Sequence, residues 1–123
     1  MPYSVAEKSA FLLVTVTGKI TGAELHKLID EGEAILKVRP HWMNNLLDLR
    51  GLDLSGLGFT DIMGFAGRKV AANPPNPFKT AIVVDSQSVG GYVRMLQNLN
   101  RNPAIAIETF EDVAAAEQWL AAA

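Results

Sequence analysis

The chain has 123 residues, of which 49% are hydrophobic and 20% charged, and its formal net charge is −2. These values predict one soluble globular domain over residues 1–123 and no binding to nucleic acid, because no basic stretch is long enough. The absence of cysteine excludes disulfides, thiolate metal sites and cysteine nucleophiles. Since no apolar run approaches the ~20 residues of a transmembrane helix and no secretory signal is present, we expect a cytoplasmic bacterial protein without a transmembrane segment.

The chain begins with two expected strands and a helix. Residues 3–7 alternate between apolar and polar, and residues 10–18 are rich in β-branched and aromatic side chains, which together predict a β-hairpin. The sequence TGAE that follows is a capping box, in which the Thr21 hydroxyl and the Glu24 carboxylate each accept a backbone amide. Apolar residues then recur at helical spacing, which predicts a helix over about 22–38.

The middle of the chain alternates strands and helices. Residues 44–50 have the composition of a buried strand, and the glycine-rich GLDLSGLG at 51–58 is expected to be a loop. Apolar residues at helical spacing predict a second helix over 59–72. The proline-rich NPPNP at 73–77 forbids helix. The nearly continuous apolar run at 79–85 is typical of a central parallel strand.

The last part of the chain predicts one more helix, strand and helix. Apolar positions between 89 and 99 have helical spacing, and residues 104–109 alternate as a strand does. TFED at 109–112 is a second capping box, with aspartate in the glutamate place, that opens a final helix. The order is ββαβαβαβα, which predicts an α/β fold with four helices and a mixed, mostly parallel sheet of about five strands.

Element order and several strings resemble the STAS domain family, found in sulfate transporters and anti-sigma-factor antagonists. The resembling strings are LLDLRGL at 46–52, KTAIVVD at 79–85 and IETFEDVAAAEQWL at 107–120. The match looks like the divergent branch of stand-alone bacterial domains. The resemblance implies a STAS-like fold over the whole chain and a non-enzymatic regulatory role in which the domain binds a protein partner.

The resemblance also draws attention to one serine. Antagonists of this family carry a loop reading Asp-Ser-Ser-Gly-Leu-Gly, whose second serine is phosphorylated. DLSGLG at 53–58 matches five of those six positions, which implies that Ser55 is a phosphorylation site. Leu54 replaces the first serine, and Phe59 and Thr60 delay the expected helix. The residues themselves also fit a plain glycine-rich turn, in which the hydroxyl caps a local amide.

Acidic side chains follow two of the expected parallel strands. Asp53 and Asp85 are expected near the carboxyl ends of those strands, where open α/β sheets bind ligands. Asp48 and Asp61 could join them in an acidic cluster that binds Mg²⁺. The alternative is that Asp85 caps the third helix and Asp61 lies in a first helical turn. Because the spacing matches no known ligand set, we predict no metal and no cofactor.

Apolar side chains in the middle of the chain form a second group of candidates. The second helix is apolar around most of its circumference, and a tryptophan lies in the loop before the strand at 44–50. These side chains either line an apolar pocket, form a homodimer contact or belong to the core. The candidates for a pocket or interface are Trp42, Met43, Ile62, Met63 and Phe65.

The sequence does not identify any catalytic residues. His26 and His41 have no serine or acid placed to indicate a triad, and SVGGY at 88–92 lacks nucleotide-binding spacing. The leading hypothesis is therefore a regulatory protein-interaction module, a homodimer switched by phosphorylation. The alternative is a carrier of a small apolar or lipid-like ligand, in a pocket beside the helix at 59–72. An enzyme of unknown type is the third hypothesis.

Overall fold

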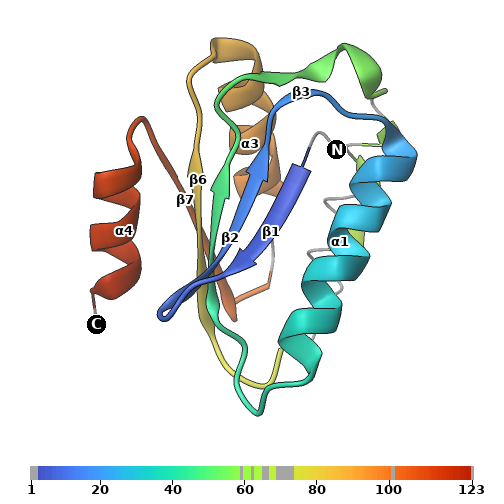
Figure 1. The fold of residues 1–123 in the computed structure, drawn as a ribbon. Helices are drawn as coiled ribbons and strands as arrows, with labels where there is room; N and C mark the ends of the chain where they lie inside the picture. Colours follow the sequence, from blue (N-terminus) through green and yellow to red (C-terminus); the bar gives the residue numbers. More distant parts are fainter. Residues whose placement is uncertain are drawn as a thin grey trace.

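The computed structural model describes residues 3–58, 60, 61, 63, 64, 67, 68, 74–100 and 102–122. Its centre is a five-stranded sheet in the order β1-β2-β4-β6-β7 (Figure 1). β1 pairs with β2 antiparallel, and the other three pairings are parallel. The mixed, mostly parallel sheet predicted from the sequence is therefore confirmed. The strands are β1 (Tyr3–Glu7), β2 (Phe11–Val16), β4 (Asn44–Asp48), β6 (Phe78–Val83) and β7 (Ile105–Phe110).

Three α-helices are delimited within the described residues, where the sequence predicts four: α1 (Gly22–Lys37), α3 (Gln87–Leu99) and α4 (Val113–Ala121). The remaining expected helix, over 59–72, falls largely outside the described residues, as do the candidates Ile62 and Phe65. The six described positions in that range, 60, 61, 63, 64, 67 and 68, have helical backbone.

A second, two-stranded sheet lies at one end of the main sheet and is not predicted from the sequence, which indicates that the second strand ends at residue 18 and that 51–58 is a loop. β3 (Gly18–Lys19) and β5 (Leu52–Asp53) pair in parallel, and the 3₁₀ turn Leu54–Gly56 follows β5. Gly18 and Gly51 have φ angles of 71° and 80°, a left-handed backbone that favours glycine. The Gly18 amide donates to the Gly51 carbonyl at 2.9 Å. Strands of two residues are too short to leave an alternating pattern in a sequence.

Side chains cap the helices, although the last cap differs from the expected one. The capping box on α1 is present as predicted, with the Glu24 amide donating to the Thr21 hydroxyl at 3.2 Å. The predicted cap of α4 at Thr109 is wrong, because Thr109 still pairs with Ile82 in the sheet. Asp112 caps the helix instead, and its carboxylate accepts the Ala115 amide at 2.7 Å.

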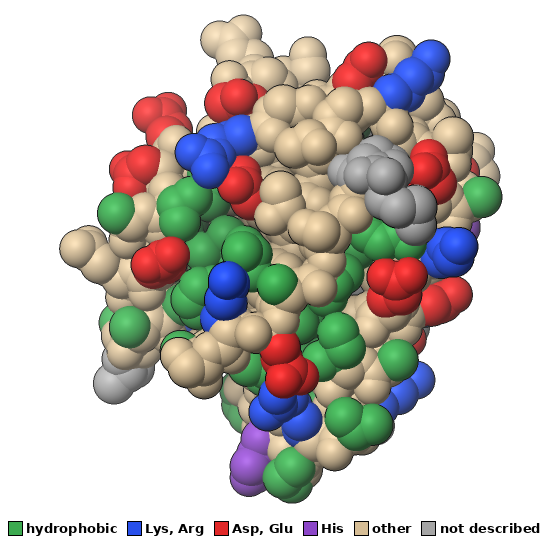
Figure 2. Space-filling view, in the orientation of Figure 1, with side chains coloured by type: hydrophobic (Ala, Val, Ile, Leu, Met, Phe, Trp, Pro, Cys, Tyr) green, Lys and Arg blue, Asp and Glu red, His purple; other side chains and the backbone are tan. Residues whose placement is uncertain are grey.

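The two faces of the sheet bury different clusters. Alternate residues of β4 and β6 point to opposite faces. On one face, Leu46, Ala81 and Val83 pack against Ala116 and Leu120 of α4. On the other face, the sheet packs against α1 and α3. Figure 1 shows α4 and α1 on opposite sides of the sheet. The outer surface drawn in Figure 2 carries acidic and basic side chains interspersed, with hydrophobic ones between them.

Candidate functional site

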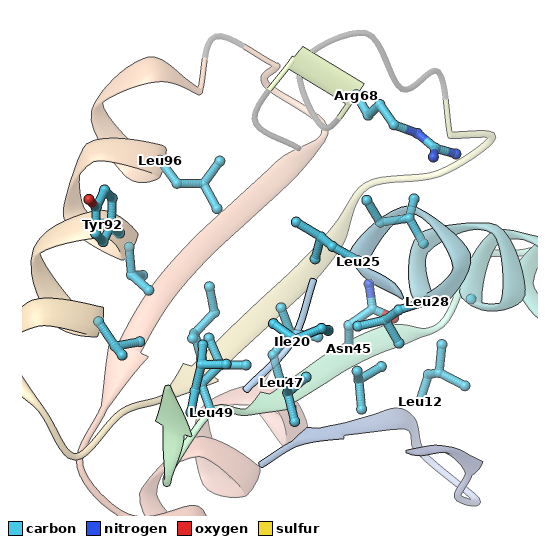
Figure 3. Close-up of a pocket in the computed structure, with 18 of the residues that line it drawn as sticks. Leu12, Ile20, Leu25, Leu28, Asn45, Leu47, Leu49, Arg68, Tyr92 and Leu96 are labelled. Carbon is cyan, nitrogen blue, oxygen red and sulfur yellow. The ribbon is translucent and has the colours of Figure 1, made fainter. Parts of the chain in front are cut away.

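An apolar pocket of about 220 Å³ opens between the sheet and the two helices α1 and α3. Figure 3 shows it from inside, with side chains from both helices and from the sheet pointing toward one another. Its lining is apolar almost throughout. The lining includes Leu12, Leu25, Leu28, Leu47, Leu49 and Leu96.

Strand alternation and one glycine explain why a pocket forms here. Leu12 of β2, Leu47 of β4 and Ile82 of β6 all lie on the sheet face that α1 and α3 cover, and all line the pocket. Gly32 of α1 also lines it, and a Cβ built there would meet no atom of the described residues within 4 Å. The helix therefore leaves open space where a larger residue would fill the pocket.

Trp42 lines this pocket, as the sequence hypothesis of a ligand carrier expects. Its ring centroid lies 5.8 Å from that of Phe78. Its backbone is fixed by Asn76, whose side chain accepts the Trp42 amide at 2.7 Å and donates to the Trp42 carbonyl at 3.0 Å. Met43 and Trp42 pack against the same cluster of buried hydrophobic side chains. Met63 is half-buried and is not among the described residues that line the pocket.

Asn45 is a polar exception in the pocket lining. It lies on the central strand β4, opposite Leu12 on one neighbouring strand and Thr80 on the other. Asn45 is only 7% exposed, and its Oδ1 has no hydrogen-bond partner among the described residues. Figure 3 shows the amide among apolar side chains. Asn45 was not among the candidates predicted from the sequence. It lies two positions before Leu47 in the expected strand, so both side chains share one face of the sheet, and a polar residue at such a position is a signal that the sequence does contain.

Charged and polar side chains lie at the rim of the pocket. Arg68, which lines it, bridges two acids of α1, Asp30 at 3.0 Å and Glu33 at 3.2 Å. The bond to Asp30 is the largest cause that raises the pKa of Arg68. Tyr92 of α3, 38% exposed, lines the pocket from the opposite side (Figure 3). An apolar interior with polar groups at its edge fits an apolar or amphipathic molecule.

Ser55 lies outside the pocket, in the 3₁₀ turn after β5. It is exposed, and its amide donates to Asp53 Oδ1 at 2.9 Å. This backbone bond, together with a bond between the two side chains, lowers the pKa of Asp53. A Cβ on Gly56 would come within 2.4 Å of the Ile20 carbonyl oxygen, so the turn requires glycine there. A glycine-rich turn therefore explains why residue 56 is glycine and why the Ser55 amide has a local hydrogen-bond acceptor.

The other expected carboxylates, Asp48, Asp61 and Asp85, each bond a different residue. The interpretation of Asp85 as the cap of α3, one of the two alternatives drawn from the sequence, is wrong. Ser86 caps α3, accepting the Val89 amide at 3.2 Å, while Asp85 Oδ1 accepts the Gly51 amide at 3.3 Å. Asp85 thus ties the end of β6 to the turn before β5. The described residues contain no group of three or more side chains able to hold a metal ion.

Asp61 occupies space that a glycine leaves open. Its Oδ2 accepts the Gly58 amide at 2.9 Å. A Cβ on Gly22, the first residue of α1, would come within 2.3 Å of Asp61 Oδ1. The carboxylate therefore lies against the positive end of the α1 dipole, a position that favours a negative charge.

Asp48 makes a bidentate pair with Arg50, and this pair predicts a pH dependence. The guanidinium donates to the two carboxylate oxygens at 2.9 and 2.8 Å and holds the pKa of Asp48 below its usual range. A lowered pKa contributes stability above the unfolded value, near pH ~4, and that stability is lost as the pH falls through the folded value. Arg50→Met should lower the free energy of unfolding only slightly at neutral pH, because solvent screens an ion pair with an exposed guanidinium.

Urea denaturation of the wild type and Arg50→Met at several pH values checks this prediction. The difference between the two proteins should be constant near neutral pH and should shrink in acid, where Asp48 is protonated in both. A difference that stays the same down to the acid limit would show that Arg50 acts through packing alone.

Searches found no family model and no curated protein that matches this chain. Several solved structures are similar to it, and two of them follow. One is an uncharacterised protein of the DUF3478 family with a SpoIIAA-like fold from Shewanella loihica PV-4, at 18% identity and a TM-score of 0.63, covering 96% of this chain and 91% of that one. The other is an anti-sigma factor antagonist from Mycobacterium paratuberculosis, at 14% identity and a TM-score of 0.62, covering 96% and 92%.

These likenesses extend over nearly the whole chain and give it a STAS-like fold. The resemblance drawn from the sequence strings is confirmed at the level of the fold. Within the described residues, none of the helices has the length and apolar character needed to cross a bilayer.

Proposed function

We propose that this chain is a non-enzymatic binding protein for a small apolar or amphipathic ligand, held between the sheet and helices α1 and α3. The observation that carries the proposal is the apolar pocket of about 220 Å³. Protein interiors are close-packed, with few voids larger than a water molecule, and empty apolar space lowers stability. A ligand that fills the space regains those contacts.

The size of the pocket limits the ligand. It is larger than the ~150 Å³ apolar cavity that accepts benzene and smaller than the ~300 Å³ at which pockets for drug-sized molecules begin. A medium-length aliphatic chain fits between these limits. This assignment takes up the second sequence hypothesis, a ligand carrier with a pocket beside the helix at 59–72 and Trp42, and adds the sheet, α1 and α3 as its walls.

Trp42 provides a direct test, because it lines the pocket while Trp119 lies on the opposite face, 5.6 Å from Phe110 between ring centroids. In a Trp119→Phe protein, Trp42 is the remaining tryptophan, and heptane and hexanol are the ligands to titrate. We expect a saturable blue shift of the Trp42 emission, because the aliphatic chain of the ligand displaces water near the indole ring. If neither compound changes the emission and calorimetry detects no heat of binding, this proposed function is wrong.

The exposed turn supports a second candidate function, the regulatory module switched by phosphorylation of Ser55. One similar structure is an anti-sigma factor antagonist, and Ser55 is exposed in the 3₁₀ turn Leu54–Gly56. A phosphate on Ser55 would add nearly two negative charges beside Asp53. Repulsion between the two groups would break their hydrogen bond and change this surface. Ser55 also borders an open hollow that it shares with Ser86 and Ser88 at the start of α3.

Phosphosite mapping on the protein isolated from its own host tests this second candidate, with Ser55→Ala expressed in the same host as control. Phosphate that maps to Ser55 and disappears in the variant supports the switch. Phosphate that is absent, or that maps elsewhere, counts against it. The homodimer is part of the same proposal, and sedimentation equilibrium of the wild type tests it separately.

A further inference from the structure

We infer that the ligand of this pocket carries one uncharged hydrogen-bond donor, of the aliphatic alcohol class, and that Asn45 Oδ1 accepts that donor. This inference rests on the proposed ligand-binding function and narrows it to a chemical class. The juxtaposition that carries it is a buried amide oxygen without a partner among the described residues, on a side chain that lines a pocket whose lining is apolar apart from its rim.

The position of Asn45 favours binding over a merely structural role. β4 is the central strand of the sheet, and Asn45 lies on its pocket face, 7% exposed. Burying an amide oxygen without a hydrogen bond is unfavourable, and most buried polar groups in proteins are paired. Asn44, the preceding residue, shows the ordinary arrangement: its Oδ1 accepts the Lys79 amide at 2.8 Å and its Nδ2 donates to the Leu120 carbonyl at 3.2 Å.

The surroundings define the chemistry of the missing partner. An amide oxygen only accepts, so the ligand group that pairs with Oδ1 must be a donor. A carboxylate at this depth would face another acceptor and lose its hydration without a cation to pair with. Arg68 is the cation among the described lining residues, and it lies at the rim, paired with Asp30 and Glu33. An ammonium group would bury its charge among leucines. A hydroxyl group donates without either penalty.

Two isomeric ligands separate the contribution of the hydrogen bond to the affinity from that of the apolar contacts. Hexanol and methyl pentyl ether have the same atoms, but only the alcohol donates. In the Trp119→Phe background, we expect hexanol to bind up to roughly tenfold more tightly than the ether, the effect of one net hydrogen bond. In Asn45→Leu, which has a side chain of similar size without the amide, we expect this preference to vanish while both ligands still bind.

Each outcome decides the inference. Equal affinity of the two isomers for the Asn45 protein, a preference for the ether, or a preference for hexanol that survives Asn45→Leu overturns it. If hexanol, the ether and heptane all fail to bind, the proposed ligand-binding function itself fails. Asn45→Val, which suits a strand, is the second variant if Asn45→Leu does not fold. Without ligand, we expect both variants to be at least as stable as the wild type, because they remove an unpaired polar group.

Discussion

Replacing Gly56 by alanine is expected to lower the free energy of unfolding by about 2–3 kcal/mol, the cost of inserting a methyl group where the chain is already packed. The added Cβ would come within 2.4 Å of the Ile20 carbonyl oxygen and 3.0 Å of Lys19 Cγ. Ile20 is 1% exposed and directly precedes the cap of α1. Because the closest atom belongs to the backbone, the turn must move away from β3 to relieve the contact.

Gly58→Ala is the matched control within the same segment. A Cβ there would meet only Asp61 Oδ2, at an ordinary 3.7 Å, and the backbone amide that bonds Asp61 is kept. Urea denaturation of both variants measures the effect. A midpoint that falls sharply for Gly56→Ala and little for Gly58→Ala supports the close packing of the turn on β3. Equal losses would show that the turn has no such constraint.

Gly32→Leu is expected to weaken the binding of hexanol by more than tenfold while leaving the protein folded. Within the part of the chain that the structure describes, the new Cβ meets no atom within 4 Å, so the leucine side chain can extend into the pocket that Gly32 lines. Leucine is also a better helix former than glycine, by up to ~1 kcal/mol. The variant should therefore be at least as stable as the wild type, and its lost binding would reflect occupied space.

Gly91→Leu on α3 is the control for this change. Gly91 also lies within a helix with open space around a new Cβ, but it is exposed and does not line the pocket. Trp42 fluorescence with the Trp119→Phe background measures both variants. Hexanol should bind to Gly91→Leu as it does to the parent protein. If Gly32→Leu binds hexanol equally well, the ligand does not occupy this pocket.

Much of the fold could be predicted because its elements carry strong local patterns. The α1 capping box, the alternation in β7 and the apolar run of β6 each leave a signature that tertiary packing does not override. Parallel pairing then follows from the helices between strands. The α4 cap was predicted wrongly because TFED matches a capping box locally, while pairing of Thr109 with β6 extends the strand and delays the helix.

The candidate site was less predictable, because a pocket depends on side chains that are distant in the sequence. Trp42 was one of the candidates for a pocket, a dimer contact or the core, and in the structure it is among the residues that line the pocket. An asparagine within an apolar strand is visible in the sequence, but the lack of a partner for the Asn45 amide oxygen is a property of the packed structure. The sequence does not mark Gly32 as a pocket residue either, because the absence of a side chain opens a pocket only if the residues packed opposite leave that space empty. Ser55 remains a prediction from resemblance.

We expect an aliphatic ligand to lie between the sheet and helices α1 and α3. Nuclear Overhauser contacts between bound hexanol and assigned methyl groups of the protein test this position. We predict contacts to methyl groups of the pocket lining, such as Leu28, Leu47 and Leu96, and none to Val83 and Leu120, which pack on the opposite face beneath α4. Contacts only to that opposite face, or no contacts under saturating hexanol, would contradict the claim.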